Sequence, residues 1–213
     1  MVKQILRGLR FRLDHLWFWV VERPALAACG SDVHLFPPYR LEGAAAISIG
    51  AATSIQRGAW LYCMPVNQTR SILRIGAGCM LGYNNHIAAV QDVVIEDEVL
   101  TANNVYISDN IHSYEDIQTP IIRQPIRFKG HVTIGRGTWL GENVVVIGAS
   151  VGRNCVIGAN AVVTRNVPDH CVAVGSPAIV IRHYDSELGR WLPGPPTATG
   201  DEQVNRTTYA RDR

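Results

Sequence analysis

A six-residue repeat occupies the middle of the chain and strongly limits what the chain can fold into. From Ile49 onward, the units open with an aliphatic residue that is often followed by Gly. Fifteen such units group into five triplets, which begin at Ile49, Ile75, Ile95, Ile134 and Val151. This spacing predicts a solenoid in which three short strands and their turns make one triangular coil of about 18 residues.

Stacked coils would bury the opening side chains in a continuous interior. The first residues of the triplets would form one inner column, and the first residues of the second units would form another. The expected members of that second column are Ile55, Leu81, Thr101, Leu140 and Ile157. Gly, Asn and Asp within the units provide turn conformations. The predicted fold class is therefore all-β, with about five parallel coils.

The inserts between triplets all follow a third unit, so they should leave the solenoid from the same edge. The longest is the excursion of residues 108–131, "SDNIHSYEDIQTPIIRQPIRFKGH". Loops of this length within a compact domain are usually either functional or disordered. This one contains Tyr, Phe and several Ile, so it has the side chains needed to fold over a bound molecule.

Composition narrows the class of protein. The formal net charge is +2, which gives no basic excess of the kind that binds nucleic acid. The five cysteines are widely spaced and form no CxxC pair, so neither a zinc site nor a redox pair is predicted. Reduced cysteines fit a cytoplasmic location.

The regions outside the repeat differ in character. Residues 1–44 are interpreted as an N-terminal helical segment and lead-in, residues 45–183 as the repeat domain, and residues 184–213 as a polar tail. The tail is interrupted by Pro and Gly and has little apolar surface to bury, so we expect it to be mostly disordered.

The N-terminal segment predicts an amphipathic helix. Its longest apolar run, "LWFWVV", is shorter than the roughly 7 residues that a signal peptide needs. One helical face would hold Leu6, Leu9, Leu13, Leu16 and Val20. Basic residues accompany this face, and two interpretations stay open: residues 1–22 pack on the protein or a neighbouring subunit, or they lie on the inner face of the cell membrane.

The repeat, and especially "WLGENVVVIGASVGRNCVIGANAVVTRNVPDHCVAVGSPAIVIR", resembles the hexapeptide-repeat acetyltransferases that act on sugars. The resemblance covers roughly residues 45–183. It implies a left-handed parallel β-helix, acetyl-CoA as the acyl donor and no metal. It also implies a homotrimer with active sites in clefts between neighbouring subunits.

The same resemblance places His112 at the catalytic position, just after the third unit of a coil. A neutral imidazole is a suitable base for a sugar hydroxyl, which can then attack the thioester without a covalent enzyme intermediate. Asp109 or Glu115 could fix the tautomer. Asn84 matches a residue near the acceptor, although Asn85 is a rival that could equally satisfy backbone groups in a turn.

The resemblance also implies donor-binding residues in the last coils. Small side chains at Gly141, Ala149 and Ala159 would let a pantetheine arm run along the coil edges, and Trp139 would lie beside the donor. The nucleotide end would be bound by residues whose charge or hydroxyl suits phosphate: Thr164, Arg165 and Arg182. The structural alternative is that the repeat requires small residues at these corners and that the arginines are solvated.

The expected function is acetyl-CoA-dependent O-acetylation of a sugar or polysaccharide precursor, with a lipid-linked oligosaccharide as acceptor if the N-terminal helix contacts membrane. One alternative is N-acetylation of a nucleotide-linked amino sugar, and another is a non-catalytic scaffold. A carbonic anhydrase would need a third histidine after His86 and His112, and Tyr114 stands near that position.

Overall fold

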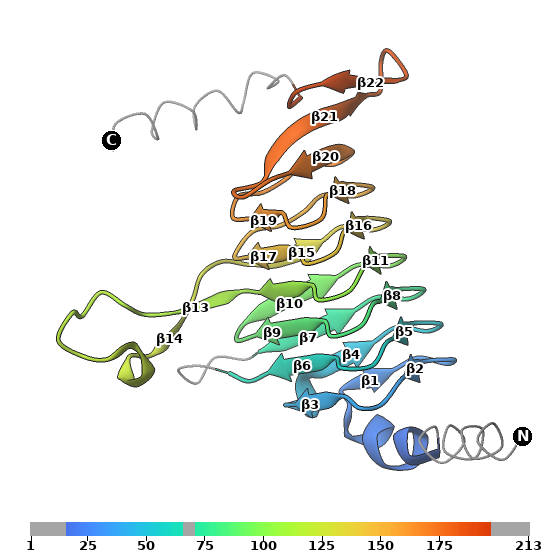
Figure 1. Ribbon diagram of the computed structural model, residues 1–213. Coiled ribbons are helices and arrows are strands. Elements are labelled where there is room, and N and C mark those ends of the chain that lie inside the picture. The colour runs from blue at the N-terminus through green and yellow to red at the C-terminus, as the bar shows by residue number, and fades with distance from the viewer. Residues whose placement is uncertain (1–15, 66–70, 197–213) are drawn as a thin grey trace, which may run out of the picture.

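Three parallel β-sheets, here called A, B and C, form the faces of a triangular prism (Figure 1). The computed structural model describes residues 16–65 and 71–196. The chain visits the sheets in the order A, B, C in each coil, so each strand pairs with the strand one coil away.

The strands of sheet A are β1 (Ala28–Cys29), β4 (Ile47–Ile49), β7 (Ile72–Ile75), β10 (Asp92–Ile95) and β15 (Val132–Ile134). Those of sheet B are β2 (His34–Leu35), β5 (Ser54–Ile55), β8 (Met80–Leu81), β11 (Leu100–Thr101), β16 (Trp139–Leu140), β18 (Val156–Ile157) and β20 (Cys171–Val174), followed by β21 (Ile179–Asp185) and β22 (Arg190–Pro193). Those of sheet C are β3 (Arg40–Glu42), β6 (Trp60–Cys63), β9 (His86–Ala89), β12 (Tyr106–Ser108), β17 (Val145–Ile147) and β19 (Val162–Val163).

Both predicted inner columns are confirmed by the strand register. Consecutive members of the first column pair from Ile49 to Ile134, and Val151 continues the column through an isolated bridge. The second column pairs from Ile55 to Ile157. All members of both columns are buried. Burial alternates along the sheet A strands, so that β4 buries both Ile47 and Ile49, and β10 buries both Val93 and Ile95.

The stack extends one coil beyond the predicted five at its N-terminal end, and Val167 and β20 add part of a coil at the C-terminal end. Strands β1–β3 form a first coil inside the segment interpreted as lead-in, so the prediction for residues 1–44 is wrong from residue 28 onward. In that coil Cys29 and Leu35 continue the two inner columns next to Ile49 and Ile55, and Leu41 pairs with Leu61 on sheet C. A cysteine at the first position and consecutive prolines at 37–38 hide this coil from the aliphatic pattern.

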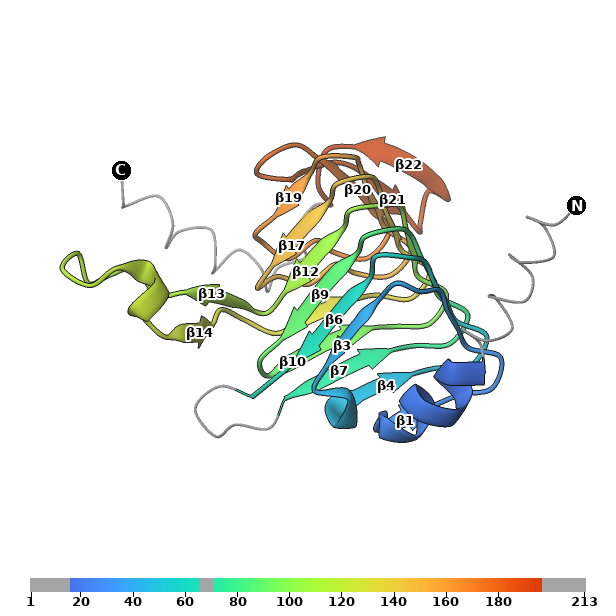
Figure 2. The same cartoon turned by 60° about the horizontal axis from the view of Figure 1, so that its bottom comes forward.

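Two short helical turns, η1 (Phe18–Glu22) and η2 (Arg23–Ala25), lie at the N-terminal end of the prism (Figure 2). Phe18 packs into the core, whereas Leu16 and Val20 from the predicted apolar face are exposed. The other predicted members of that face, at positions 6, 9 and 13, lie outside the described residues. No helix of the described residues is long and apolar enough to span a membrane.

The excursion that follows β12 is a hairpin rather than an irregular loop at its base. Strands β13 (Asn110–His112) and β14 (Ile126–Phe128) pair antiparallel, and a single turn, η4 (Ile121–Arg123), lies near the tip. Figures 1 and 2 show this hairpin projecting away from the prism. Apolar side chains near the tip are strongly exposed, with Ile117 at 89% and Ile122 at 90%.

The prediction of disorder from residue 184 is wrong for the first part of the tail. Strand β21 turns back antiparallel on β20, and β22 pairs with β21. Asp185 accepts hydrogen bonds from two backbone N–H groups of the connecting turn, and Tyr184 meets Trp191 edge-on at 5.7 Å. This local turn chemistry and ring contact fold a polar sequence that offers little core. Residues 197–213 lie outside the described residues.

Candidate active site

The connections from sheet C to the next sheet A strand form one long edge of the prism, here called the C–A edge. His112 lies on this edge, at the end of β13 and opposite Ile126 of β14. Its side chain is exposed, and no described residue hydrogen-bonds to its imidazole. Both ring nitrogens are therefore available to a ligand in this single chain.

Neither of the two carboxylates considered as orienting groups contacts His112. Asp109 is fully buried, and its carboxylate accepts backbone N–H bonds from the preceding coil. Glu115 accepts a hydrogen bond from the Tyr114 N–H at 3.0 Å and pairs with Arg127 at 2.8 Å. The bond from the Tyr114 backbone is the main cause that lowers the pKa of Glu115.

Asn84 lies on a different edge, where sheet B strands connect to sheet C (the B–C edge). It adopts a left-handed turn conformation with φ of 56°, and its amide donates to the Asn104 side chain at 3.2 Å. Asn85 is buried and accepts a hydrogen bond from the Val105 N–H at 2.8 Å. That contact matches the turn-satisfying role considered for Asn85. A single chain does not bring Asn84 to His112.

His86 takes part in an aromatic ladder on the outer face of sheet C. Its ring stacks on Trp60 with centroids 4.1 Å apart, and Tyr106 follows it at 5.1 Å. Burial lowers the pKa of His86, and the positive charge of Arg40 lowers it further. Trp60 covers one face of the ring, and the lowered pKa favours the neutral imidazole.

The predicted donor-binding residues fall into two groups. Thr164 and Arg165 are exposed on the C–A edge, between β19 and the last coil, and therefore share an edge with His112. The others lie on sheet B or the B–C edge: Trp139, Gly141, Ala159 and Arg182. The structure thus separates the candidate residues onto two sides of the prism.

The packing of the coils also explains why the residues at positions 141 and 149 are small. A Cβ atom added to Gly141 would lie 2.8 Å from the backbone nitrogen of Ala159. The B–C corners of consecutive coils therefore pack too closely for a side chain at position 141. Ala149, on the C–A edge, is buried, so its size is set by the core. Ala159 is exposed at the B–C corner, where its surface is available to a ligand.

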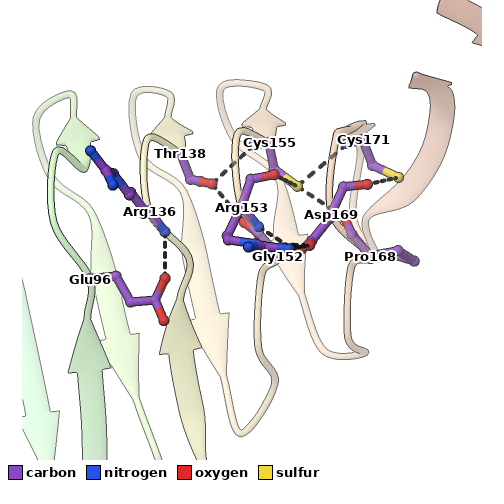
Figure 3. Close-up of polar contacts among 9 residues, drawn as sticks. All are labelled: Glu96, Arg136, Thr138, Gly152, Arg153, Cys155, Pro168, Asp169 and Cys171. Atoms are coloured by element: carbon purple, nitrogen blue, oxygen red, sulfur yellow. Dashed lines mark hydrogen bonds and ion pairs between the residues drawn. The ribbon is translucent and has the colours of Figure 1, made fainter. Parts of the chain in front are cut away.

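The third edge, from sheet A to sheet B, is bound together by polar contacts that the sequence did not reveal (Figure 3). Thr138 donates to the Gly152 carbonyl at 2.7 Å and accepts from the Cys155 N–H at 3.0 Å. Arg153 donates to the Asp169 carboxylate through its backbone N–H at 2.8 Å and through its guanidinium at 2.7 Å. These contacts join neighbouring coils, so the side chains of this A–B edge stabilise the stack.

The cysteines offer no reactive thiol. All five are free, and four are buried. Burial, followed by the proximity of Cys155, raises the pKa of Cys171 to about 11. A thiol with so high a pKa carries almost no thiolate at neutral pH, which disfavours nucleophilic catalysis. Among residues 16–65 and 71–196, no three His, Cys, Asp or Glu side chains group together in a way that could hold a metal ion.

Comparison with known proteins identifies relatives of this repeat. The family model described as "Hexapeptide repeat of succinyl-transferase" matches residues 72–109 and 131–165. The chain is 40% identical over 133 residues to the Mycobacterium tuberculosis protein named "Probable acetyltransferase Rv3034c", covering 61% of this chain and 44% of that protein. It is 32% identical over 133 residues to the galactoside O-acetyltransferase of Escherichia coli K12, covering 62% and 64%.

The fold is shared with solved acyltransferase structures. AntD, an N-acyltransferase from Bacillus cereus solved with dTDP and 3-hydroxybutyryl-CoA, superposes with a TM-score of 0.65 at 15% identity, covering 79% of this chain and 88% of AntD. This similarity confirms the predicted class of left-handed parallel β-helix. The chain spans less than two thirds of the length of either sequence relative named above.

Proposed function

We propose that this chain, whose repeat matches a hexapeptide-repeat family model and is similar to acetyltransferases, transfers an acetyl group from acetyl-CoA to a hydroxyl of a sugar or polysaccharide precursor. The observation that carries the proposal is the placement of His112. Its exposed imidazole stands on a hairpin that projects from the prism, on the same edge as Thr164 and Arg165.

His112 acts as the general base. Its neutral imidazole accepts the proton of the acceptor hydroxyl while the hydroxyl oxygen attacks the thioester carbonyl. The proton then passes from the imidazolium to the departing thiolate of coenzyme A, which restores the neutral ring. The carbonyl oxygen gains negative charge during this step and needs a hydrogen-bond donor, for which a backbone N–H is suited.

The described residues fit the chemistry of the donor. Arg165 offers a cation and Thr164 a hydroxyl donor, both exposed and suited to the phosphates of coenzyme A. The B–C corner around Gly141 and Ala159 offers a surface of small residues suited to an extended pantetheine arm. Trp139, 47% exposed on sheet B, adds an apolar surface beside that corner.

A homotrimer with sites between subunits would unite these two groups. One chain holds His112 and Arg165 on the C–A edge, and a neighbouring copy would present the sheet B side that holds Trp139. A cyclic assembly around an axis parallel to the prism brings unlike edges together at the same height. The separation of the candidate residues within one chain supports this arrangement.

Exposed apolar surfaces support the same assembly. Met80, Leu100 and Trp139 lie in register on the outer face of three consecutive sheet B strands, and each is at least 42% exposed. The hairpin with Ile117 and Ile122 leaves from the middle of these three coils, so its base lies at the height of this surface. Clustered apolar surface of this kind is typical of protein interfaces.

The N-terminal end supports peripheral contact with the inner face of the cell membrane. Leu16, Trp17 and Val20 are each more than half exposed around η1, and the sequence that precedes them contains several basic residues. An apolar face with an aromatic residue and nearby cations suits a lipid surface. Loss of binding to anionic vesicles in a Trp17→Ser, Val20→Ser variant would support this location, whereas unchanged binding would exclude it.

The decisive experiment measures release of coenzyme A from acetyl-CoA with a panel of sugars, amino sugars and oligosaccharides. His112→Ala should lower acceptor-dependent turnover by about 10²–10⁴-fold. His131→Ala is the matched control, because His131 is another exposed histidine at the base of the excursion, paired with Asp92 at 3.4 Å. This control should retain wild-type turnover.

The outcomes separate the competing functions. Turnover with hydroxyl acceptors alone supports O-acetylation, and turnover only with amino sugars would favour N-acetylation. Equal turnover of wild type and His112→Ala would remove His112 from the mechanism. Absence of acetyl-CoA binding by calorimetry would favour a scaffold, and a monomeric mass by light scattering would exclude sites between subunits.

A further inference from the structure

A buried carboxylate lies at the root of the hairpin that carries His112. Asp109 follows β12 directly and precedes β13, and it is 0% exposed. Acidic side chains are almost never fully buried unless they are paired. Within residues 16–65 and 71–196, Asp109 pairs with no cation, so other groups must stabilise its charge.

Those groups are backbone N–H donors of the preceding coil. The Asp109 carboxylate accepts hydrogen bonds from Val90 at 2.9 Å, Gln91 at 2.7 Å and Asp92 at 2.9 Å. The Asn110 side-chain amide adds a fourth donor at 3.0 Å. Charge-assisted bonds of this kind are shorter and stronger than neutral ones. The carboxylate therefore fixes residue 109 to the C–A corner of the coil below.

The backbone of the same residue holds both ends of the excursion. The Asp109 N–H donates to the Ala88 carbonyl at 3.4 Å. The Asp109 carbonyl accepts from the N–H of Lys129 at 2.7 Å and that of Gly130 at 3.4 Å, where the chain returns from the hairpin. Asp109 thus ties the departing strand and the returning strand to one point of the prism.

We propose that Asp109 is a positioning residue that holds the hairpin, and with it the His112 imidazole, at a fixed place relative to the prism. This inference rests on the proposed function of His112 as general base. His112 closely follows Asp109 in the chain, on a two-stranded ribbon that makes its β pairing with itself alone. An isolated ribbon is only marginally stable, so its direction depends on its anchor.

The test is the substitution Asp109→Asn. The new amide side chain would offer one acceptor oxygen instead of two, and its NH₂ group would face backbone donors, so the anchor loosens with little change in volume. We expect kcat to fall about 10- to 100-fold, as a small misplacement of a catalytic group does, with KM for acetyl-CoA within about twofold. Asp97→Asn is the matched control: Asp97 accepts from the Ala77 N–H at 2.7 Å on the A–B edge. It should change neither constant.

Two further measurements act independently of turnover. In the Asp109→Asn variant, trypsin should cleave after Arg123 faster than in wild type, and the His112 imidazole NMR signal should shift while the melting temperature changes no more than in Asp97→Asn. Unchanged cleavage and an unchanged His112 signal would overturn the proposal. So would a loss of kcat, acetyl-CoA affinity and melting temperature together, which would mean that Asp109 is merely structural.

The proposal can fail separately from the proposed function. If wild type transfers no acetyl group to any acceptor, the function fails, and the cleavage rate and the His112 signal still decide whether Asp109 anchors the hairpin. If Asp109→Asn does not fold, Asn110→Ala removes only the amide donor. A partial shift of the His112 signal and partially faster cleavage would then support the anchor, and wild-type behaviour would overturn it.

Discussion

The prism and its hairpin differ in how their strands pair and in how deeply their apolar side chains are buried. In the prism, strands pair with strands of neighbouring coils, and the members of the two inner columns from Ile49 and Ile55 onward are at most 3% exposed. In the hairpin, two strands pair only with each other, and Ile117 and Ile122 are almost fully exposed. Stability and the candidate chemistry are therefore located in different parts of the molecule. The same substitution made in the prism and in the hairpin should change stability by different amounts.

The largest difference between prism and hairpin in the free energy of unfolding is expected when an isoleucine is replaced. Ile134 is fully buried in the first inner column, so Ile134→Ala should lower the free energy of unfolding by about 2–5 kcal/mol through lost burial and a cavity. Ile122→Ala should lower it by less than about 0.5 kcal/mol, because the side chain is exposed in the chain. Urea unfolding checks this under conditions in which both variants are monomeric by light scattering, so that contacts between subunits do not contribute. Equal losses would show that the hairpin belongs to the cooperative core.

A smaller difference in stability between the two regions is expected when a threonine is replaced. Thr138→Val leaves the half-buried Gly152 carbonyl and the buried Cys155 N–H without their hydroxyl partner, which should cost about 1–3 kcal/mol. Thr119→Val, near the hairpin tip, should change stability by less than about 0.5 kcal/mol. Thermal unfolding of the two variants beside wild type provides the comparison. A neutral Thr138→Val would mean that the A–B edge does not depend on this hydroxyl.

The smallest difference concerns acid stability. The backbone N–H of Arg153, followed by its guanidinium, lowers the pKa of Asp169 in the folded protein. The contribution is therefore fully present above the unfolded pKa of about 4 and is lost as pH falls through the folded value. The side chain is 39% exposed, so screening limits it to about 0.2–1 kcal/mol.

The difference in unfolding free energy between wild type and Asp169→Asn should accordingly be present at pH 7, shrink below about pH 4 and weaken in high salt. Asp116→Asn on the hairpin is the matched control, since its pKa is also lowered, chiefly by Thr119, but it lies in the region that adds little to global stability. A pH-independent difference for Asp169→Asn would remove the ion pair as its cause.

The periodic part of the fold was predictable from sequence because each opening aliphatic residue has one consequence, burial. Ile49 and Ile55 could be assigned to columns by counting alone. The first coil was not predicted, because Cys29 stands at the column position and prolines follow Leu35. The pairing of β21 with β22 was not predicted, because it depends on a local turn at Asp185 and one ring contact, which composition does not reveal.

The candidate site was predictable only as a set of residues. Counting units already places His112 and Trp139 on different sides of a coil, but whether a second copy joins them depends on assembly. The anchor at Asp109 could not be predicted, because its partners are the backbone N–H groups of residues 90–92. Backbone donors exist at nearly every position, so the sequence does not mark the ones that are used.

The antiparallel return of β21 onto β20 fixes the length of the prism. A parallel coil cannot be added to sheet B beyond β20, because β21 occupies that edge and β22 covers β21 in turn. The outermost strand also carries Pro193, which has no N–H to offer to another strand. The C-terminal end of the stack is thus protected against end-to-end growth into fibres, a hazard for any molecule whose strands all point the same way.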